Sequence, residues 1–123
     1  MTTSAEIRKV IARDGGQCVI AGPHCQGVAV TADHRANRGS GGSRALDNPA
    51  NLVACCALCN GLKEDADGEY RTELIERGIR VVKAATNAAT VTRAQLTPVR
   101  YPDGTEWWLT TNYRRVQDEL PPF

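Results

Sequence analysis

The sequence predicts an α+β fold, and three observations carry this prediction. Residues 3–14 have the start signal and apolar spacing of a helix, residues 51–63 are typical of a strand followed by a helix, and residues 97–110 are typical of a β-hairpin. A chain of 123 residues has the length of one domain with a modest core, which a bound metal would help to stabilise. We therefore expect a single domain over 1–123, with a core at about 18–65 and a helix and hairpin extension at 66–123.

The N-terminal helix is predicted by its start and stop signals. Thr3 and Glu6 have the spacing of a capping box, and apolar residues recur at helical spacing as far as Ile11. The glycine pair at 15–16 ends the pattern. We expect this helix to pack against the core.

A first strand is predicted before a dipeptide of chemical interest. Val28, Val30 and Ala32 alternate with small or polar residues, which favours a half-buried strand that ends at Asp33 and His34. Successive strand residues face opposite sides. Both side chains can serve one site only if the strand twists or bulges there, or if the site lies at its edge.

A long polar loop and a second strand follow. Residues 35–49 are so rich in Gly, Ser and Asn that we expect no regular element there, and a substrate-facing loop is the favoured interpretation. Residues 51–55 are predicted to return as the second strand, with Cys55 pointing into the core as a small apolar residue. A helix is predicted from about Ala57, and it carries Cys59, Asn60 and Lys63.

The rest of the chain is predicted in less detail. A structural helix follows the break at 67–68 and ends at Gly78, whereas residues 81–95 show no firm period and fit helix, loop or linker. The turn at 102–104 joins the strands of the hairpin. Trp107 and Trp108 are adjacent, so one faces the core and the other either covers a packing surface or contacts a nucleic acid.

Five cysteines indicate a metal site. The chain has no apolar run long enough to span a bilayer and no signal peptide, so we expect a cytoplasmic protein whose thiols stay reduced. The pair with C-x2-C spacing also fits thioredoxin-like redox chemistry, but an earlier pair favours structural Zn²⁺. His24 is a rival of Cys25 as a ligand, and the spacing selects Cys56 over Cys55. The predicted zinc ligands are Cys18, Cys25, Cys56 and Cys59.

The charge is uneven along the chain. Residues 1–63 hold seven Lys/Arg and four Asp/Glu, a net charge of +3, whereas residues 64–123 hold eight and ten, a net charge of −2. Arg35, Arg38 and Arg44 lie in the polar loop, where they either contact phosphates or are simply solvated. The weak overall charge argues against a protein that coats nucleic acid.

The remaining polar residues suit phosphodiester hydrolysis. That reaction needs a base to activate water and a divalent cation to stabilise negative charge. His34 can supply the base, and Asp33 and Asn60 are hard oxygen donors that suit Mg²⁺ or Mn²⁺. The four soft thiolates select Zn²⁺ at a separate, structural position.

The order DH, then Asn, then C-x2-C-N over about residues 18–65 resembles the HNH endonuclease family, whose ββα-metal fold surrounds one catalytic cation. The resemblance implies that His34 is the general base, that Asn51 braces the loop, and that Asn60 ligates the cation together with Asp33. Many members have His where this chain has Asn60. The resulting HNN variant occurs in HNH nucleases that resolve branched DNA and in RNA-guided nucleases, so it alters a ligand without implying inactivity.

The layout, with its terminal VRYPDGTEWWL hairpin, is also similar to small stand-alone HNH proteins encoded by bacteriophages, some of them near genome-packaging genes. This implies DNA as the partner, contacted by Arg35, Arg38, Arg44 and Lys63. It also implies a place in the host cytoplasm, phage packaging proteins as further partners, and a role in processing concatemers. The alternatives are a zinc-stapled DNA-binding module without catalysis, and an interaction protein merely stabilised by zinc.

Overall fold

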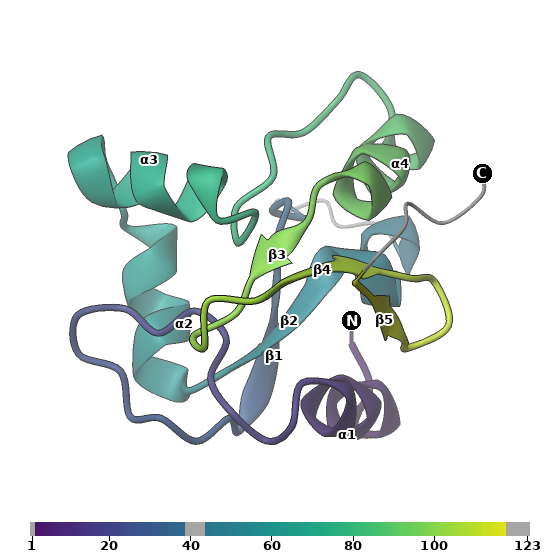
Figure 1. Ribbon diagram of the computed structural model, residues 1–123. Coiled ribbons are helices and arrows are strands. Elements are labelled where there is room, and N and C mark those ends of the chain that lie inside the picture. Colours follow the sequence, from purple (N-terminus) through teal and green to yellow (C-terminus); the bar gives the residue numbers. More distant parts are fainter. Residues whose placement is uncertain (1, 39–43, 118–123) are drawn as a thin grey trace.

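The computed structural model describes residues 2–38 and 44–117, which form a mixed α/β structure with two small antiparallel sheets (Figure 1). The first sheet pairs β1 with β2, and the second has the order β3-β4-β5. The elements in these ranges are α1 (Ser4–Arg13), β1 (Thr31–His34), the 3-10 helices η1 (Arg44–Asp47) and η2 (Pro49–Asn51), β2 (Leu52–Cys55), α2 (Ala57–Glu64), α3 (Gly68–Glu76), α4 (Asn87–Leu96), β3 (Val99–Arg100), β4 (Glu106–Leu109) and β5 (Arg115–Val116).

The predicted N-terminal helix is confirmed, including its cap. The Thr3 hydroxyl accepts a hydrogen bond from the Glu6 N–H at 3.1 Å, and the Glu6 carboxylate accepts one from the Thr3 N–H at 2.9 Å. This reciprocal pair satisfies donors that the first helical turn leaves unpaired. Val10 is fully buried, so the helix packs against the core through that face.

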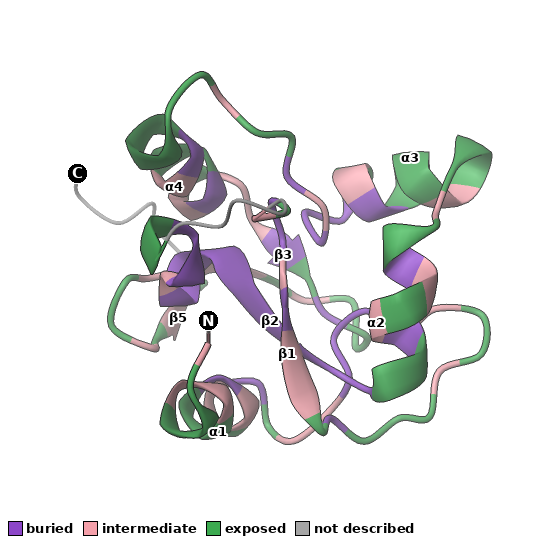
Figure 2. Cartoon of the chain, turned by 180° about the vertical axis from the view of Figure 1, so that it is seen from behind, coloured by how far each residue is buried: buried purple, intermediate pink, exposed green. Residues whose placement is uncertain are grey.

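The β1–β2 pair is confirmed, but the inward side of its first strand is not the one expected. Val28 and Val30 are 66% and 62% exposed, whereas Ala29 and Asp33 are buried. Asp33 can lie on the inner side because Lys63 of α2 supplies a charged partner at that depth. β2 is buried along its whole length, as Figure 2 shows.

The expectation of a loop without regular structure over 35–49 is wrong for its second half. η1 and η2 form there because Asn48 caps the second turn, accepting a hydrogen bond from the Ala50 N–H at 3.0 Å. Pro49 fixes the backbone angle of the first helical position. Residues 39–43 of the predicted loop lie outside the described residues.

The C-terminal extension shares the core of the first half. One apolar cluster contains Val10 and Leu52 as well as Leu74, Val99 and Leu109. The helix after the break at 67–68 and the hairpin are confirmed, the undecided segment 81–95 contains most of α4, and β5 adds a strand that the sequence did not predict. In the described part of the chain, the longest helices have ten residues, and none is long and apolar enough to cross a membrane.

The aromatic side of the hairpin is held by a cation. Trp107 packs against the core, and its indole N–H donates to the Thr105 hydroxyl at 2.8 Å. The guanidinium of Arg115 lies 4.1 Å from the centre of the Trp107 ring and 4.6 Å from that of Tyr101. These contacts indicate a packing role for Trp107.

Candidate metal centre and catalytic residues

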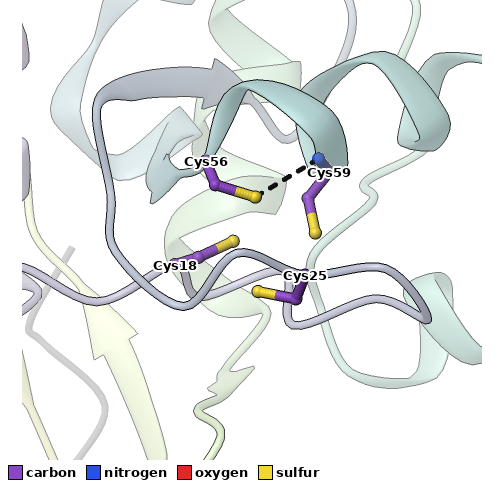
Figure 3. Close-up of side chains that lie close together, drawn as sticks. All are labelled: Cys18, Cys25, Cys56 and Cys59. Carbon is purple, nitrogen blue, oxygen red and sulfur yellow. Dashed lines mark hydrogen bonds between the residues drawn. The ribbon is translucent and has the colours of Figure 1, made fainter.

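Four cysteines form a group that can hold a metal ion. Cys18 and Cys25 come from the turn after α1, and Cys56 and Cys59 come from the junction of β2 and α2 (Figure 3). Their four sulfur atoms all lie within 4.8 Å of one another. The rival ligand His24 is exposed and lies outside this group.

The backbone around the cysteines favours ionised sulfur. Four N–H groups point at sulfur atoms of the cluster, and such donors stabilise thiolates. The contacts are Gly22 N to Cys59 Sγ at 3.4 Å, Gln26 N to Cys56 Sγ at 3.5 Å, Gly27 N to Cys25 Sγ at 3.2 Å and Cys59 N to Cys56 Sγ at 3.4 Å. One of the four donors, Gly22, lies between Cys18 and Cys25, and two more, Gln26 and Gly27, directly follow Cys25.

The surroundings of the thiols shift their pKa values in opposite directions. Burial opposes ionisation of Cys56, but the N–H groups of Gln26 and Cys59 lower its pKa to about 6. Burial raises the pKa values of Cys18 and Cys59. Neighbouring thiolates repel one another, so a cation bound among them would favour their ionised forms.

The donor set fits zinc, which prefers a tetrahedron of soft ligands. Four sulfur atoms at about 2.3 Å from Zn²⁺ lie about 3.8 Å apart, so the widest pairs in the cluster need to converge by at most about 1 Å. Cys55 lies outside the group of four, and burial and the nearby Asp33 raise the pKa of its thiol. The C-x2-C spacing thus selected the correct neighbour.

Asp33 is held by a buried lysine. Lys63 Nζ lies 2.9 Å from Asp33 Oδ2 and donates to the His34 carbonyl oxygen at 2.8 Å. The Lys63 side chain is only 1% exposed. Because Lys63 lies one turn after Asn60 on α2, these contacts bring the helix against the end of β1.

His34 contacts a second carboxylate. Its Nε2 lies 2.7 Å from Asp47 Oδ1. Asp47 is also bound by Arg44, whose Nη1 donates to Oδ2 at 2.9 Å, and by Arg38, whose Nε lies 3.6 Å from Oδ1. Although burial opposes ionisation of Asp47, the hydrogen bond from His34 and the charge of Arg38 lower the pKa of its carboxyl group.

Asn51 joins the two ends of the loop that follows His34. Its Oδ1 accepts from the Ala36 N–H at 2.8 Å, and its Nδ2 donates to the carbonyl oxygens of Ala36 at 3.1 Å and Leu46 at 2.9 Å. The side chain is fully buried. Both the segment after His34 and the segment before Asp47 are therefore fixed to the start of β2.

Asn60 directly follows Cys59 in α2. Its N–H donates to the Cys56 carbonyl oxygen at 3.1 Å in the first turn of α2, and the residue is partly exposed. One turn later, Glu64 accepts a hydrogen bond from Asn37 Nδ2 at 3.0 Å. This contact links the far end of α2 to the loop after β1.

Two of the four residues that we expected to contact DNA are buried. Arg35 is fully buried and donates to the carbonyl oxygens of residues 50, 78, 94 and 97, at 2.6–2.8 Å. These carbonyl groups belong to three chain segments: η2, the turn after α3 and the C-terminal end of α4. Lys63 is buried against Asp33, so it too is not placed to meet a phosphate. Arg38 and Arg44 both lie beside Asp47, and the Arg44 side chain is 59% exposed.

Asp47 was not among the site residues predicted from the sequence. It occupies a Gly- and Ser-rich stretch that carries no apolar periodicity, and the one signal for it is the i, i+3 spacing of Arg44 and Asp47. The role of Lys63 was likewise missed, since a lysine on a helix is usually exposed.

Comparison of the chain with protein-family models, with curated proteins and with solved structures found no match.

Proposed function

We propose that this protein is a metal-dependent DNA endonuclease of the HNH type, with the ββα-metal arrangement formed by β1, β2 and α2. The observation that carries the proposal is the contact of β1 with α2 and η1, because Asp33 is paired with Lys63 of α2 and His34 is paired with Asp47 of η1. A carboxylate, an imidazole and the amide of Asn60 thus come from two adjoining elements. These are the groups that hydrolysis of a phosphodiester requires.

Each group has a separate task in this proposal. His34 takes a proton from the attacking water, and Asn51 holds the loop that positions it. A Mg²⁺ or Mn²⁺ ion held by the oxygen atoms of Asp33 and Asn60 would neutralise charge on the phosphate and on the leaving oxygen. Lys63 keeps the Asp33 carboxylate in place at the end of β1. Arg38 and Arg44 supply positive charge for the DNA backbone.

We further propose that the cysteine cluster binds one structural Zn²⁺. The metal would fix the turn after α1 to the first turn of α2, and so hold Asn60 and Lys63 against β1. The resemblance to phage proteins supports DNA processing in the host cytoplasm, with packaging proteins as partners.

A DNA-binding module without catalysis is the second candidate. It requires a broad basic surface, but two of the four cations expected to contact DNA, Arg35 and Lys63, are buried. Such a module also has no use for a histidine bound to a buried carboxylate. The pairing of His34 therefore favours the nuclease.

Nicking of supercoiled plasmid tests the proposal. Wild type should convert the plasmid to open circles with Mg²⁺ or Mn²⁺ and should not do so with chelator. His34→Ala should lower the rate roughly 10²- to 10⁴-fold, as expected for loss of a general base, while zinc content and DNA binding persist. The chain has two histidines, so His24→Ala at the exposed position is the matched control and should nick like wild type. Wild-type rates from His34→Ala would overturn the nuclease and favour the binding module.

A further inference from the structure

We propose that Asp47 fixes the tautomer of His34, so that Nε2 carries the proton and Nδ1 is the nitrogen that accepts a proton during hydrolysis. The inference rests on the proposed nuclease function and assigns a positioning residue to it. Its basis is the 2.7 Å contact between His34 Nε2 and Asp47 Oδ1. An ionised carboxylate can only accept hydrogen bonds, so the imidazole must donate from Nε2. In a neutral ring the lone pair then lies on Nδ1.

The surroundings of Asp47 keep it ionised. Arg44 Nη1 donates to Oδ2 at 2.9 Å, and Arg38 Nε lies 3.6 Å from Oδ1. The Asp47 side chain is 1% exposed, so these charges act at short range with little water between them. Both arginines stabilise the carboxylate form over the acid form. The proton shared with His34 therefore stays on the imidazole.

The position of Asp47 is fixed through the backbone. Asp47 ends η1, directly after the fully buried Leu46, whose carbonyl oxygen accepts from Asn51 Nδ2 at 2.9 Å. Asn51 leads directly into β2, where Leu52 pairs with His34. A short path of contacts therefore connects the carboxylate to the strand that carries the histidine, and the ring orientation is set before any substrate binds.

With this tautomer, every proton and electron pair of the hydrolytic step is accounted for. Nδ1 takes one proton from water, and the electron pair of the broken O–H bond stays on oxygen, which bonds to phosphorus. The bond from phosphorus to the leaving oxygen breaks, and that oxygen keeps the pair and takes a proton from solvent. The imidazolium that forms carries its new charge beside the Asp47 carboxylate, which stabilises it.

The substitution Asp47→Asn gives a directional test. Arg44 donates to the Oδ2 position, so the amide oxygen of the new side chain should take that place and the amide nitrogen should face His34. The nitrogen donates, so Nε2 must become an acceptor and the ring must change to the Nδ1–H tautomer. The base nitrogen is then blocked. We expect kcat to fall roughly 10²- to 10⁴-fold, with KM near the wild-type value.

Nitrogen-15 NMR of the zinc-loaded full chain, without DNA and at mildly alkaline pH, reads the tautomer directly. The protein has two histidines, and the spectrum of His24→Ala assigns His34. Wild type should show an unprotonated Nδ1 at His34, and Asp47→Asn should show a protonated one. Asp103→Asn, an exposed carboxylate in the hairpin turn, is the matched control and should leave the tautomer and kcat unchanged.

A wild-type His34 with a protonated Nδ1, or a tautomer that is the same in wild type and Asp47→Asn, overturns the inference. A merely structural role of Asp47 would lower thermal stability without changing the tautomer, and that result overturns it as well. Since the tautomer is read without DNA, its failure is distinct from failure of the nuclease. A protein with the expected tautomer that never nicks plasmid overturns the nuclease and leaves the pairing of Asp47 with His34 established.

Discussion

Lys63 and Asp33 form a buried ion pair between α2 and the end of β1, with Nζ 2.9 Å from Oδ2. Both side chains are less than a tenth exposed, so each charge depends on the other. Removal of one partner from such a pair strands the other and costs about 3–5 kcal/mol, whereas replacement of both is often neutral.

The pair predicts non-additive stability changes. Asp33→Asn and Lys63→Met should each lower the free energy of unfolding by about 3–5 kcal/mol, and the double variant should recover most of that loss. Urea unfolding of the zinc-loaded protein measures all three. Additive losses would show that the two charges do not interact. Asp33→Ala is a poorer test of cation binding than Asp33→Asn. It removes the charged partner of Lys63 and also leaves a cavity.

The cysteine cluster predicts one zinc per chain. Cys56→Ser should lower the zinc content and destabilise the protein, since Cys56 supplies a ligand and caps α2. Cys55→Ser is the matched control, because it changes the adjacent buried thiol and should leave zinc content unchanged. Elemental analysis gives the ratio. Correctly folded, active protein without zinc, or the reverse pattern for the two variants, would contradict the assignment.

The pKa of Asp47 predicts a loss of stability in acid. Its pKa is lowered in the folded state, so its stabilising contribution is complete above the unfolded pKa of about 3.9 and is lost as pH falls through the lower folded value. The difference in unfolding free energy between wild type and Asp47→Asn should be constant from about pH 7 to about pH 5 and shrink towards zero below about pH 3. Denaturant unfolding across this range measures it. A difference that does not change with pH would mean that Asp47 acts through packing alone.

The loop arginines predict a salt-dependent affinity. Arg38→Ala and Arg44→Ala should each weaken DNA binding about equally across sequences and reduce the slope of log K against log salt by roughly one. Arg8→Ala, an exposed arginine on α1, is the control and should leave the slope unchanged. Fluorescence anisotropy with a labelled duplex at several salt concentrations gives the slopes. A change in sequence preference at constant slope would indicate contact with bases instead.

Local signals predicted much of the fold. The capping box of Thr3 and Glu6, the C-x2-C spacing and the turn at 102–104 each depend on residues a few positions apart, so their physics is visible in the chain. The side of β1 that faces inward was not predicted, because it depends on Lys63, about thirty positions later. The inward side of a strand is set by what its neighbours can bury or neutralise.

In the candidate site, too, features set by nearby residues were predicted and features set by distant residues were not. The grouping of the four cysteines followed from spacing and redox chemistry, but the partners of His34 and Arg35 did not. A loop arginine is normally solvated, and only the meeting of distant backbone carbonyls makes its burial favourable. In the sequence, Asp47 is one of many polar residues of the loop. Its role depends on η1, which places its carboxylate next to His34.

Arg35 has a consequence for where this protein can be divided. Three of the four carbonyl oxygens that receive its guanidinium belong to Gly78, Ala94 and Thr97, all beyond the predicted core at 18–65. A fragment ending near residue 65 would keep the acceptor of Ala50 alone and would have to expel or strand a cation beside Asn51 and His34. The segment that holds the chemistry is therefore not a portable module: transplanting it into another scaffold requires a substitute for the C-terminal half at this one side chain.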